Sequence, residues 1–345
     1  MNRRSLLAIS GIFFGSLLFP TFLLAQGVSP SSIISPISAS DISVELSNEN
    51  PGPREQVSIS IQSFSFDLNS ALTVWYVDGK KVASGYGIKT QNITTGGLGV
   101  RTSVSIVVST PTGDVSKDFS LIPATVDLTW EALTYTPPFF KGKPLFTNQA
   151  TVKFIAFPHV FRNGTEVNPA NLIYTWSNNG TVFADMSGYG KNTFSIAGAF
   201  IPRPLTVEVK ATDPNTGSTA VGRVSLSPQQ PFSLLYKNDP LYGVQYEKAL
   251  TGTYRLSGRE VEIFAVPYYF SAASVQSSAL TYTWRINGTA VTDGENSPTK
   301  VFRAAGDSFG TSNISLSIEH ANRILQTSKT STVITFEKPA EQSLF

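Results

Sequence analysis

The sequence predicts an all-β protein of three tandem immunoglobulin-like β-sandwich domains that follow an N-terminal signal peptide or membrane anchor. Three observations predict this fold class. A stretch with a central Trp and a closing turn occurs three times in the sequence. The copies are separated by about the number of residues in one sandwich domain, and large and polar side chains alternate along the expected strands.

The repeated stretch reads ALTVWYVDG at residues 71–79, LIYTWSNNG at 172–180 and LTYTWRING at 280–288. In the third copy Leu280, Tyr282 and Trp284 alternate with polar residues, so the large side chains share one face of a strand. Each copy closes with Asp-Gly or Asn-Gly, which suits a type I′ hairpin turn because both central residues take a positive φ.

Large apolar residues recur with the Trp. Ile93, Phe194 and Phe302 each follow a Trp by eighteen positions. The Trp residues lie 101 and 108 positions apart, the length of one immunoglobulin-like domain. We predict a structural core that contains Trp75, Trp176, Trp284, Phe194 and Phe302. The alternative interpretation is an exposed Trp that stacks on a sugar.

From the start of the chain, residues 1–25 form a signal peptide or membrane anchor, with Arg3 and Arg4 before an apolar run at 6–24. A signal cleaved after Ala25 is favoured, and an uncleaved anchor stays open because the run is almost long enough to span a bilayer. Membrane contact is expected only through residues 6–24, if they are retained.

The remaining divisions follow the repeats. Residues 26–40 are a Ser/Pro-rich linker, 41–122 are domain 1, 123–228 are domain 2, 229–338 are domain 3 and 339–345 are a tail. Both connections between domains are short and contain Pro, which predicts a semi-rigid rod.

Composition excludes several function classes. The chain has no Cys, which removes thiolate catalysis, Cys-ligated zinc and iron–sulfur clusters. Its net charge is +2 without a Lys/Arg cluster, so nucleic acid is not an expected partner. The two His residues lie in different repeats and no G-x-S-x-G stretch occurs, so we predict a protein that is not an enzyme and has no cofactor or metal. The stretch from Asp213 to Gly217 resembles the start of a calcium loop, but a hairpin turn is the favoured interpretation.

Aromatic residues gather in the segments before the second strand of domains 2 and 3. The candidate ligand or partner surface consists of Trp130, Tyr135, Phe139, Phe140, Tyr242 and Tyr246. These residues could pack at the joints between domains or form an exposed binding surface. Packing is favoured because joints need apolar area.

The stretches Tyr174-Thr-Trp176 and Tyr282-Thr-Trp284, each with Gly four residues after the Trp, resemble the Y-x-W strand of bacterial PKD-like and immunoglobulin-like tandem surface domains. The resemblance covers residues 41–336. It implies a non-catalytic spacer, adhesin or ligand-binding module on an exported bacterial protein.

The predicted function is therefore a non-enzymatic structural or adhesive rod, exported to the bacterial cell surface or envelope or secreted. Its expected partner is a protein or glycan at the cell surface, or another copy of the chain. Two alternatives stay open: a carbohydrate-binding module that uses exposed aromatic residues, and an accessory subunit of an envelope or pilus-type assembly.

Overall fold

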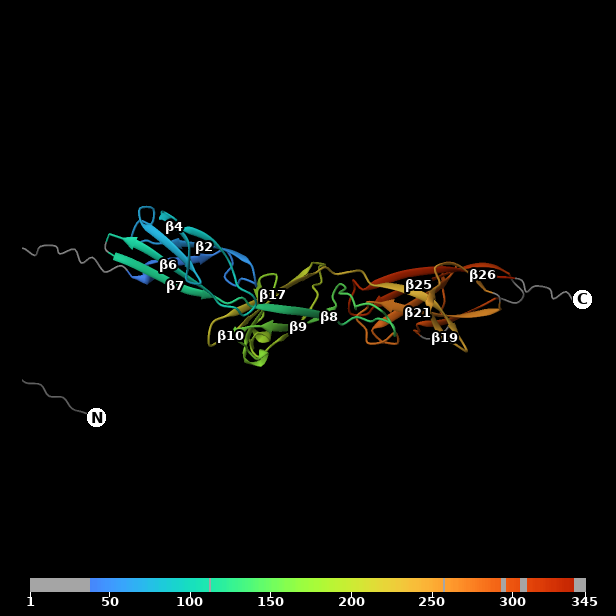
Figure 1. Cartoon of the computed structure of the whole chain (residues 1–345). Coiled ribbons are helices and arrows are strands. Elements are labelled where there is room, and N and C mark those ends of the chain that lie inside the picture. Colours follow the sequence, from blue (N-terminus) through green and yellow to red (C-terminus); the bar gives the residue numbers. More distant parts are fainter. Residues whose placement is uncertain (1–37, 112, 257, 293–295, 305–308, 338–345) are drawn as a thin grey trace, which may run out of the picture.

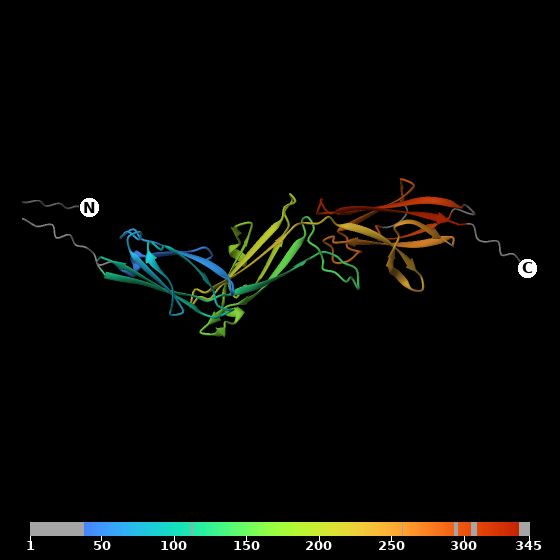
Figure 2. The same ribbon diagram turned by 45° about the horizontal axis from the view of Figure 1, so that its top comes forward.

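The computed structural model describes residues 38–337, except 112, 257, 293–295 and 305–308. Apart from one short two-stranded hairpin, the described strands form three pairs of sheets that follow one another along an elongated rod (Figure 1 and Figure 2). The predicted all-β fold of tandem immunoglobulin-like sandwiches is confirmed. The predicted signal or anchor, most of the linker and the tail lie outside the described residues. Among the residues that are described, no helix is long and apolar enough to cross a membrane.

Sandwich 1 packs a sheet of order β1-β2-β5 against a sheet of order β4-β3-β6-β7. Its elements are η1 (Ala39–Asp41), β1 (Ser43–Leu46), β2 (Gln56–Gln62), β3 (Leu72–Val77), β4 (Lys80–Tyr86), β5 (Thr90–Thr94), β6 (Thr102–Thr110) and β7 (Gly113–Leu121). Val57, Ile59 and Ile61 of β2 are buried and the residues between them are not, so the alternation in sequence decides which face of the sheet is inside.

Sandwich 2 packs a sheet of order β15-β9-β8 against a sheet of order β13-β12-β16-β17, in which β14 also pairs with β12. Its elements are β8 (Thr125–Ala132), β9 (Thr151–His159), β10 (Phe161–Arg162), β11 (Thr165–Glu166), η2 (Pro169–Asn171), β12 (Ile173–Asn178), β13 (Thr181–Val182), η3 (Ala184–Met186), β14 (Gly188–Tyr189), β15 (Thr193–Ala197), β16 (Leu205–Thr212) and β17 (Thr219–Leu226). The short β10–β11 hairpin extends β9 toward sandwich 1 and later forms part of the candidate site (Figure 1).

Sandwich 3 packs a sheet of order β19-β18-β21-β24 against a sheet of order β20-β26-β25-β22-β23. Its elements are β18 (Phe232–Asp239), β19 (Gly243–Ala249), β20 (Gly252–Leu256), β21 (Glu260–Tyr268), β22 (Leu280–Ile286), β23 (Thr289–Ala290), β24 (Thr299–Arg303), β25 (Gly310–His320) and β26 (Thr327–Phe336). Strand β20 pairs with β26 in parallel and so covers the edge of the longest hairpin of this sandwich.

Each sandwich contains one repeated Trp in its core. Trp75 and Trp176 are fully buried and Trp284 is 5% exposed. Each indole also donates a hydrogen bond from Nε1 to a backbone carbonyl: Trp75 to Ile88 at 3.2 Å, Trp176 to Lys191 at 2.8 Å and Trp284 to Ser297 at 3.0 Å. A buried indole N–H needs such an acceptor, so these carbonyls fix how each ring lies between the two sheets.

Phe194 and Phe302 lie against the Trp of their own sandwich. The Phe194 ring stacks on Trp176 with centroids 5.3 Å apart, and the Phe302 ring meets Trp284 edge-on at 5.6 Å. The turns after the Trp strands have positive φ at both central residues, for example 49° at Asn179 and 80° at Gly180. This is the backbone of a type I′ turn, in which Gly carries no steric cost.

Candidate functional site

The two joints between sandwiches differ in construction. At the joint between sandwiches 2 and 3, named the 2–3 joint, backbone groups of the two sandwiches bond directly. Tyr135 N donates to Phe270 O at 2.7 Å, and Tyr269 N donates to Tyr135 O at 2.8 Å. The buried hydroxyl of Thr147 donates to Tyr269 O at 2.9 Å. Two backbone hydrogen bonds and one side-chain hydrogen bond thus join sandwich 2 directly to sandwich 3.

The β25–β26 turn adds a second set of bonds across this joint. Gln326 is fully buried, and its Nε2 donates to Asn148 O at 2.8 Å. Arg323 Nε donates to Gln149 O at 3.0 Å, and Leu325 N donates to Gln149 Oε1 at 3.1 Å. A change in the relative position of the two sandwiches would break these bonds and leave the buried amide of Gln326 without partners. Because an unpaired buried amide costs free energy, the bonds oppose such a change.

An aromatic cluster closes the 2–3 joint. Its buried members are Tyr236, Val266, Tyr268 and Tyr269 of sandwich 3. The ring of Phe140, from the segment after β8, meets Tyr268 and Tyr269 edge-on at 5.9 and 6.1 Å. Tyr135 packs on the same cluster, where burial raises its pKa to about 12 because the phenolate is poorly solvated there.

The six aromatic residues singled out from the sequence do not form one surface. Tyr135, Phe140 and Tyr246 pack at the aromatic cluster. Trp130 lies half-buried against the core of sandwich 2, with Lys143 Nζ 3.5 Å from its ring centroid. Phe139 is 96% exposed, and Tyr242, in the β18–β19 turn, is 78% exposed. A continuous aromatic platform for a sugar is therefore not what these residues build.

The joint between sandwiches 1 and 2, named the 1–2 joint, is built around one glycine. Within the described residues, the hydrogen bond at this joint is formed by the backbone: Gly99 N of sandwich 1 donates to O of Pro123, in the connection between the sandwiches, at 3.0 Å. Gly99 has a φ of 71°, and the ring of Phe161 from β10 lies over it. A Cβ at this position would stand 2.5 Å from the ring, so the close approach of the two sandwiches requires glycine.

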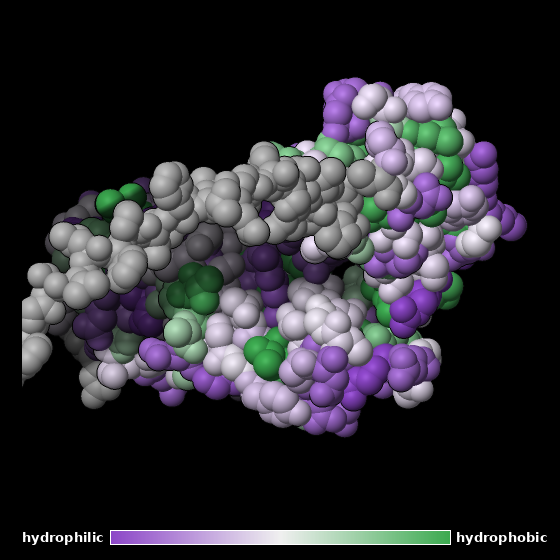
Figure 3. Space-filling view, turned by 90° about the vertical axis from the view of Figure 1, so that its left-hand side faces the viewer, coloured by the Kyte–Doolittle hydropathy of each residue, from purple (hydrophilic) through white to green (hydrophobic). Residues whose placement is uncertain are grey.

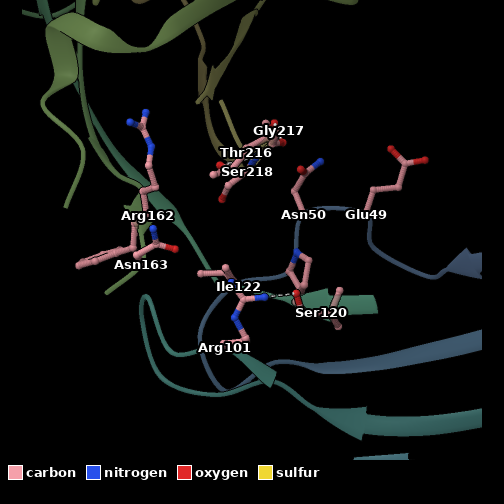
Figure 4. A pocket seen from close by; sticks show the side chains of 14 residues that line it. Glu49, Asn50, Arg101, Ser120, Ile122, Arg162, Asn163, Thr216, Gly217 and Ser218 are labelled. Carbon is pink, nitrogen blue, oxygen red and sulfur yellow. Dashed lines mark hydrogen bonds between the residues drawn. The ribbon is translucent and has the colours of Figure 1, made fainter. Parts of the chain in front are cut away.

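A polar cleft of about 300 Å³ opens beside Gly99, between the two sandwiches (Figure 4). Sandwich 1 supplies Arg101, the Glu49–Pro51 turn and the end of β7, whereas sandwich 2 supplies the β10–β11 hairpin and the turn between β16 and β17. In Figure 4 the segment from Thr216 to Ser218 lies across the cleft from Arg101. This cleft is the candidate functional site.

An ion pair holds the sandwich 2 wall of the cleft. The fully buried carboxylate of Asp213 accepts from Arg162 Nε at 2.9 Å and Nη2 at 2.5 Å, and from Thr216 Oγ1 at 2.7 Å. The Arg162 guanidinium holds the pKa of Asp213 far below its usual range. The stretch that resembled a calcium loop is the β16–β17 turn, and Arg162 occupies both oxygens of its first carboxylate.

Arg101 faces the cleft without a carboxylate partner among the described residues. Its Nη1 donates to Ser120 Oγ at 2.7 Å, which fixes the guanidinium against the end of β7. The other N–H groups of Arg101 have no acceptor in the described part of the chain. In Figure 4 the guanidinium groups of Arg101 and Arg162 lie apart, so the charge of Arg101 is not repelled at close range.

Sequence reasoning missed both Arg101 and Arg162. Neither stands in a motif, and their meeting in one cleft depends on how two separate sandwiches are oriented. The sequence feature near this site was the run of residues with side-chain oxygens that starts at Asp213. This run indicated a structured turn but not which residues lie opposite it.

No protein family model matches this sequence, and no curated protein matches it. Among solved structures, three N-terminal domains of the Highly Immunogenic Outer Capsid protein of bacteriophage RB49 are similar, at 12% identity and a TM-score of 0.25, over 86% of this chain and 98% of that one. A Bacteroides ovatus mixed-linkage glucan utilization locus protein, SGBP-B, solved with a heptasaccharide, is similar at 11% identity and a TM-score of 0.25, over 86% and 70%. The central fibronectin-III array of RIM-binding protein is similar at 13% identity and a TM-score of 0.28, over 85% and 96%. At these values the similarity concerns the fold, and nothing about a ligand follows from it.

Proposed function

We propose that this chain is a non-enzymatic structural or adhesive rod that acts at the bacterial cell surface or envelope. The observation that carries the proposal is the 2–3 joint. A spacer needs a fixed angle between its domains, and here backbone bonds, a buried amide and an aromatic cluster all cross from one sandwich to the next. Relative motion is the default for neighbouring domains of one chain, and the direct contacts across this joint oppose it.

Three further features support this proposal. The three sandwiches follow one another end to end, so the molecule is long and narrow (Figure 2). Seen from the end of sandwich 1, apolar residues stand in separate groups among polar ones, as on a surface that faces water (Figure 3). The basic and apolar N-terminal stretch of the sequence is the basis for placing the rod outside the cytoplasm.

The stiffness of the 2–3 joint can be measured directly because the chain has no Cys. Lys153→Cys in β9 and Lys329→Cys in β26 provide two exposed spin-label sites, one in each sandwich. We expect a narrow distance distribution by pulsed electron paramagnetic resonance. Phe140→Ala removes the edge-on ring contacts across the joint and should broaden the distribution, whereas Phe139→Ala, at the exposed neighbouring position, should leave it unchanged. A broad distribution in the unmodified joint would refute the rigid rod.

The proposed location needs a separate test in the cells that make this protein. Intact cells are treated with a membrane-impermeant amine reagent, and the labelled lysines are mapped by mass spectrometry. Exposed lysines such as Lys153 and Lys329 should react without cell lysis if the rod is at the surface. Labelling only after lysis, together with recovery from the cytoplasmic fraction, would exclude a surface role.

A further inference from the structure

We propose that the cleft between sandwiches 1 and 2 binds a saccharide that carries a carboxylate, and that Arg101 binds this carboxylate. The structural role of the rod does not depend on this site: a rod with an empty cleft would still hold its ends apart. Four features of the cleft point to this ligand: its position, its fixed walls, the charge of Arg101 without a carboxylate partner among the described residues, and the hydrogen-bonding groups around it.

The position is one where ligand sites form. The cleft lies at a domain joint, and its volume of about 300 Å³ is at the lower end of the range for small-molecule pockets. Both sandwiches contribute lining residues, so an occupant would contact the two bodies at once.

Both walls are fixed before any ligand arrives. In sandwich 1 the turn that carries Glu49 and Asn50 is held by Glu55, whose carboxylate accepts from Asn48 Nδ2 at 2.9 Å and from Gly52 N at 2.6 Å. In sandwich 2 the opposite turn is held by the buried carboxylate of Asp213. A binding site whose groups are already in place loses less conformational entropy when it is occupied.

The charges favour an anionic group at one end of the cleft. Arg162 is neutralised by Asp213, whereas Arg101 has only the hydroxyl of Ser120 as a partner within the described residues. A guanidinium presents a planar fork of donors that matches a carboxylate in two parallel hydrogen bonds. Glu49, the acidic residue of the lining, is exposed and in Figure 4 points away from Arg101.

The rest of the lining favours a ligand with many hydroxyl groups. The lining also contains the amides of Asn50 and Asn163 and the hydroxyl of Ser218. The hydroxyl of Thr216 donates to Asp213 and is available to a ligand as an acceptor. Amides and hydroxyls both donate and accept, as the hydroxyl groups of a sugar do, and Glu49 can accept from further hydroxyls. Each hydroxyl of a sugar both donates and accepts, whereas a backbone N–H of a peptide only donates and a C=O only accepts. A uronic acid unit can therefore pair with these groups in more arrangements than an acidic peptide can.

The test is calorimetric titration of the intact rod with an oligogalacturonate and with the matching neutral oligogalactoside. We expect the oligogalacturonate alone to bind, with an affinity that falls as salt rises because the contact is ionic. Arg101→Gln should weaken binding at least about tenfold, the effect of losing a charged hydrogen-bond partner. Arg203→Gln, at an exposed arginine outside the cleft, is the matched control and should change nothing.

Four outcomes of the titration would overturn the proposal. The first is equal binding by the unmodified rod and Arg101→Gln, and the second is equal binding of the neutral sugar. The third is no binding at about 10 mM oligogalacturonate, where even a millimolar Kd would be visible. Binding of poly-glutamate as tightly as the sugar would instead assign the cleft to acidic peptides and reject the saccharide.

A second readout does not depend on affinity alone. Because the ligand would contact both sandwiches, it should narrow the distance distribution between spin labels at Ser116→Cys in β7 and Lys153→Cys in β9. The distribution between Lys153→Cys and Lys329→Cys should stay the same with and without ligand. A distribution that stays unchanged when the sugar binds would contradict an occupant that contacts both sandwiches.

Discussion

At the scale of single residues, the Trp of each repeat does more than fill space. The indole contributes large apolar area to the core, and its Nε1 satisfies a carbonyl that follows it by thirteen or fifteen residues. Periodicity in the sequence was enough to predict burial, because a strand with alternating large side chains has one inner face. The acceptor carbonyls could not be predicted, since each lies in an irregular loop whose path depends on the whole sandwich.

Trp176 separates these two contributions. Trp176→Ala should lower the free energy of unfolding of sandwich 2 by about 3–5 kcal/mol, the usual cost of emptying an aromatic core site. Trp176→Phe keeps much of the apolar contact with Phe194 but leaves Lys191 O without its donor, and should cost about 1–3 kcal/mol. Urea denaturation followed by circular dichroism measures both values. Unchanged stability of the Ala variant would show that the ring is not in the core.

His159 gives sandwich 2 a pH dependence. Its Nδ1 lies 2.7 Å from Glu166 Oε1, and its Nε2 lies 3.5 Å from Asp127 Oδ2. The hydrogen bond to Glu166 raises the pKa of His159 above 6.5, so the folded state binds the proton more tightly than the unfolded chain does. This stabilisation is complete below the unfolded pKa and is lost as the pH rises through the folded pKa.

His159→Gln should therefore destabilise the protein more in acid than in base. Because the pair is partly exposed, the difference between about pH 5.5 and about pH 8 should be within ~1 kcal/mol. Thermal melts of the variant and the unmodified protein across this range would measure it. A larger loss at the alkaline end would reverse the assignment of the charged partner.

At the scale of elements, hairpins and alternating strands followed from the sequence, but strand β20 did not. Its residues 252–256 belong to the long segment before the second strand of the third repeat, where aromatic residues were the visible feature. The sequence of a five-residue strand does not indicate which other strand it pairs with. Its parallel pairing with β26 depends on contacts between residues about eighty positions apart, such as Thr332 Oγ1 to Gly252 O at 3.0 Å.

Strand β20 should protect sandwich 3 from self-association. Successive N–H groups of a strand point to opposite sides, so the double variant Thr253→Pro/Tyr254→Pro removes the donor that faces β26 whichever residue carries it. We expect a loss of about 1–3 kcal/mol in stability and an open β26 edge that associates with other copies. Analytical ultracentrifugation checks the second effect. Thr253→Val/Tyr254→Phe keeps both N–H groups and should remain monodisperse to the same degree as the unmodified protein.

At the scale of the whole molecule, the two joints follow different designs. Short Pro-containing connections in the sequence predicted a semi-rigid stack, but they gave no sign that one joint is cross-bonded and the other built on a glycine contact. The length of each connection limits only the distance between two neighbouring sandwiches and leaves their relative orientation open. The angle between them is set by side chains distant in sequence, such as Gln326 with Asn148, and Phe161 with Gly99.

Gly99 is where this difference can be tested. Gly99→Ala places a Cβ against the Phe161 ring at a backbone φ that disfavours any side chain, so the loop or the ring must move. We expect the distance distribution between labels at Ser116→Cys and Lys153→Cys to shift or broaden. The distribution between Lys153→Cys and Lys329→Cys should stay narrow, because every contact of the 2–3 joint is retained. If both distributions changed together, the two joints would be coupled and the rod would move as one cooperative body. If neither changed, the contact between Gly99 and Phe161 would not be what sets the angle between sandwiches 1 and 2.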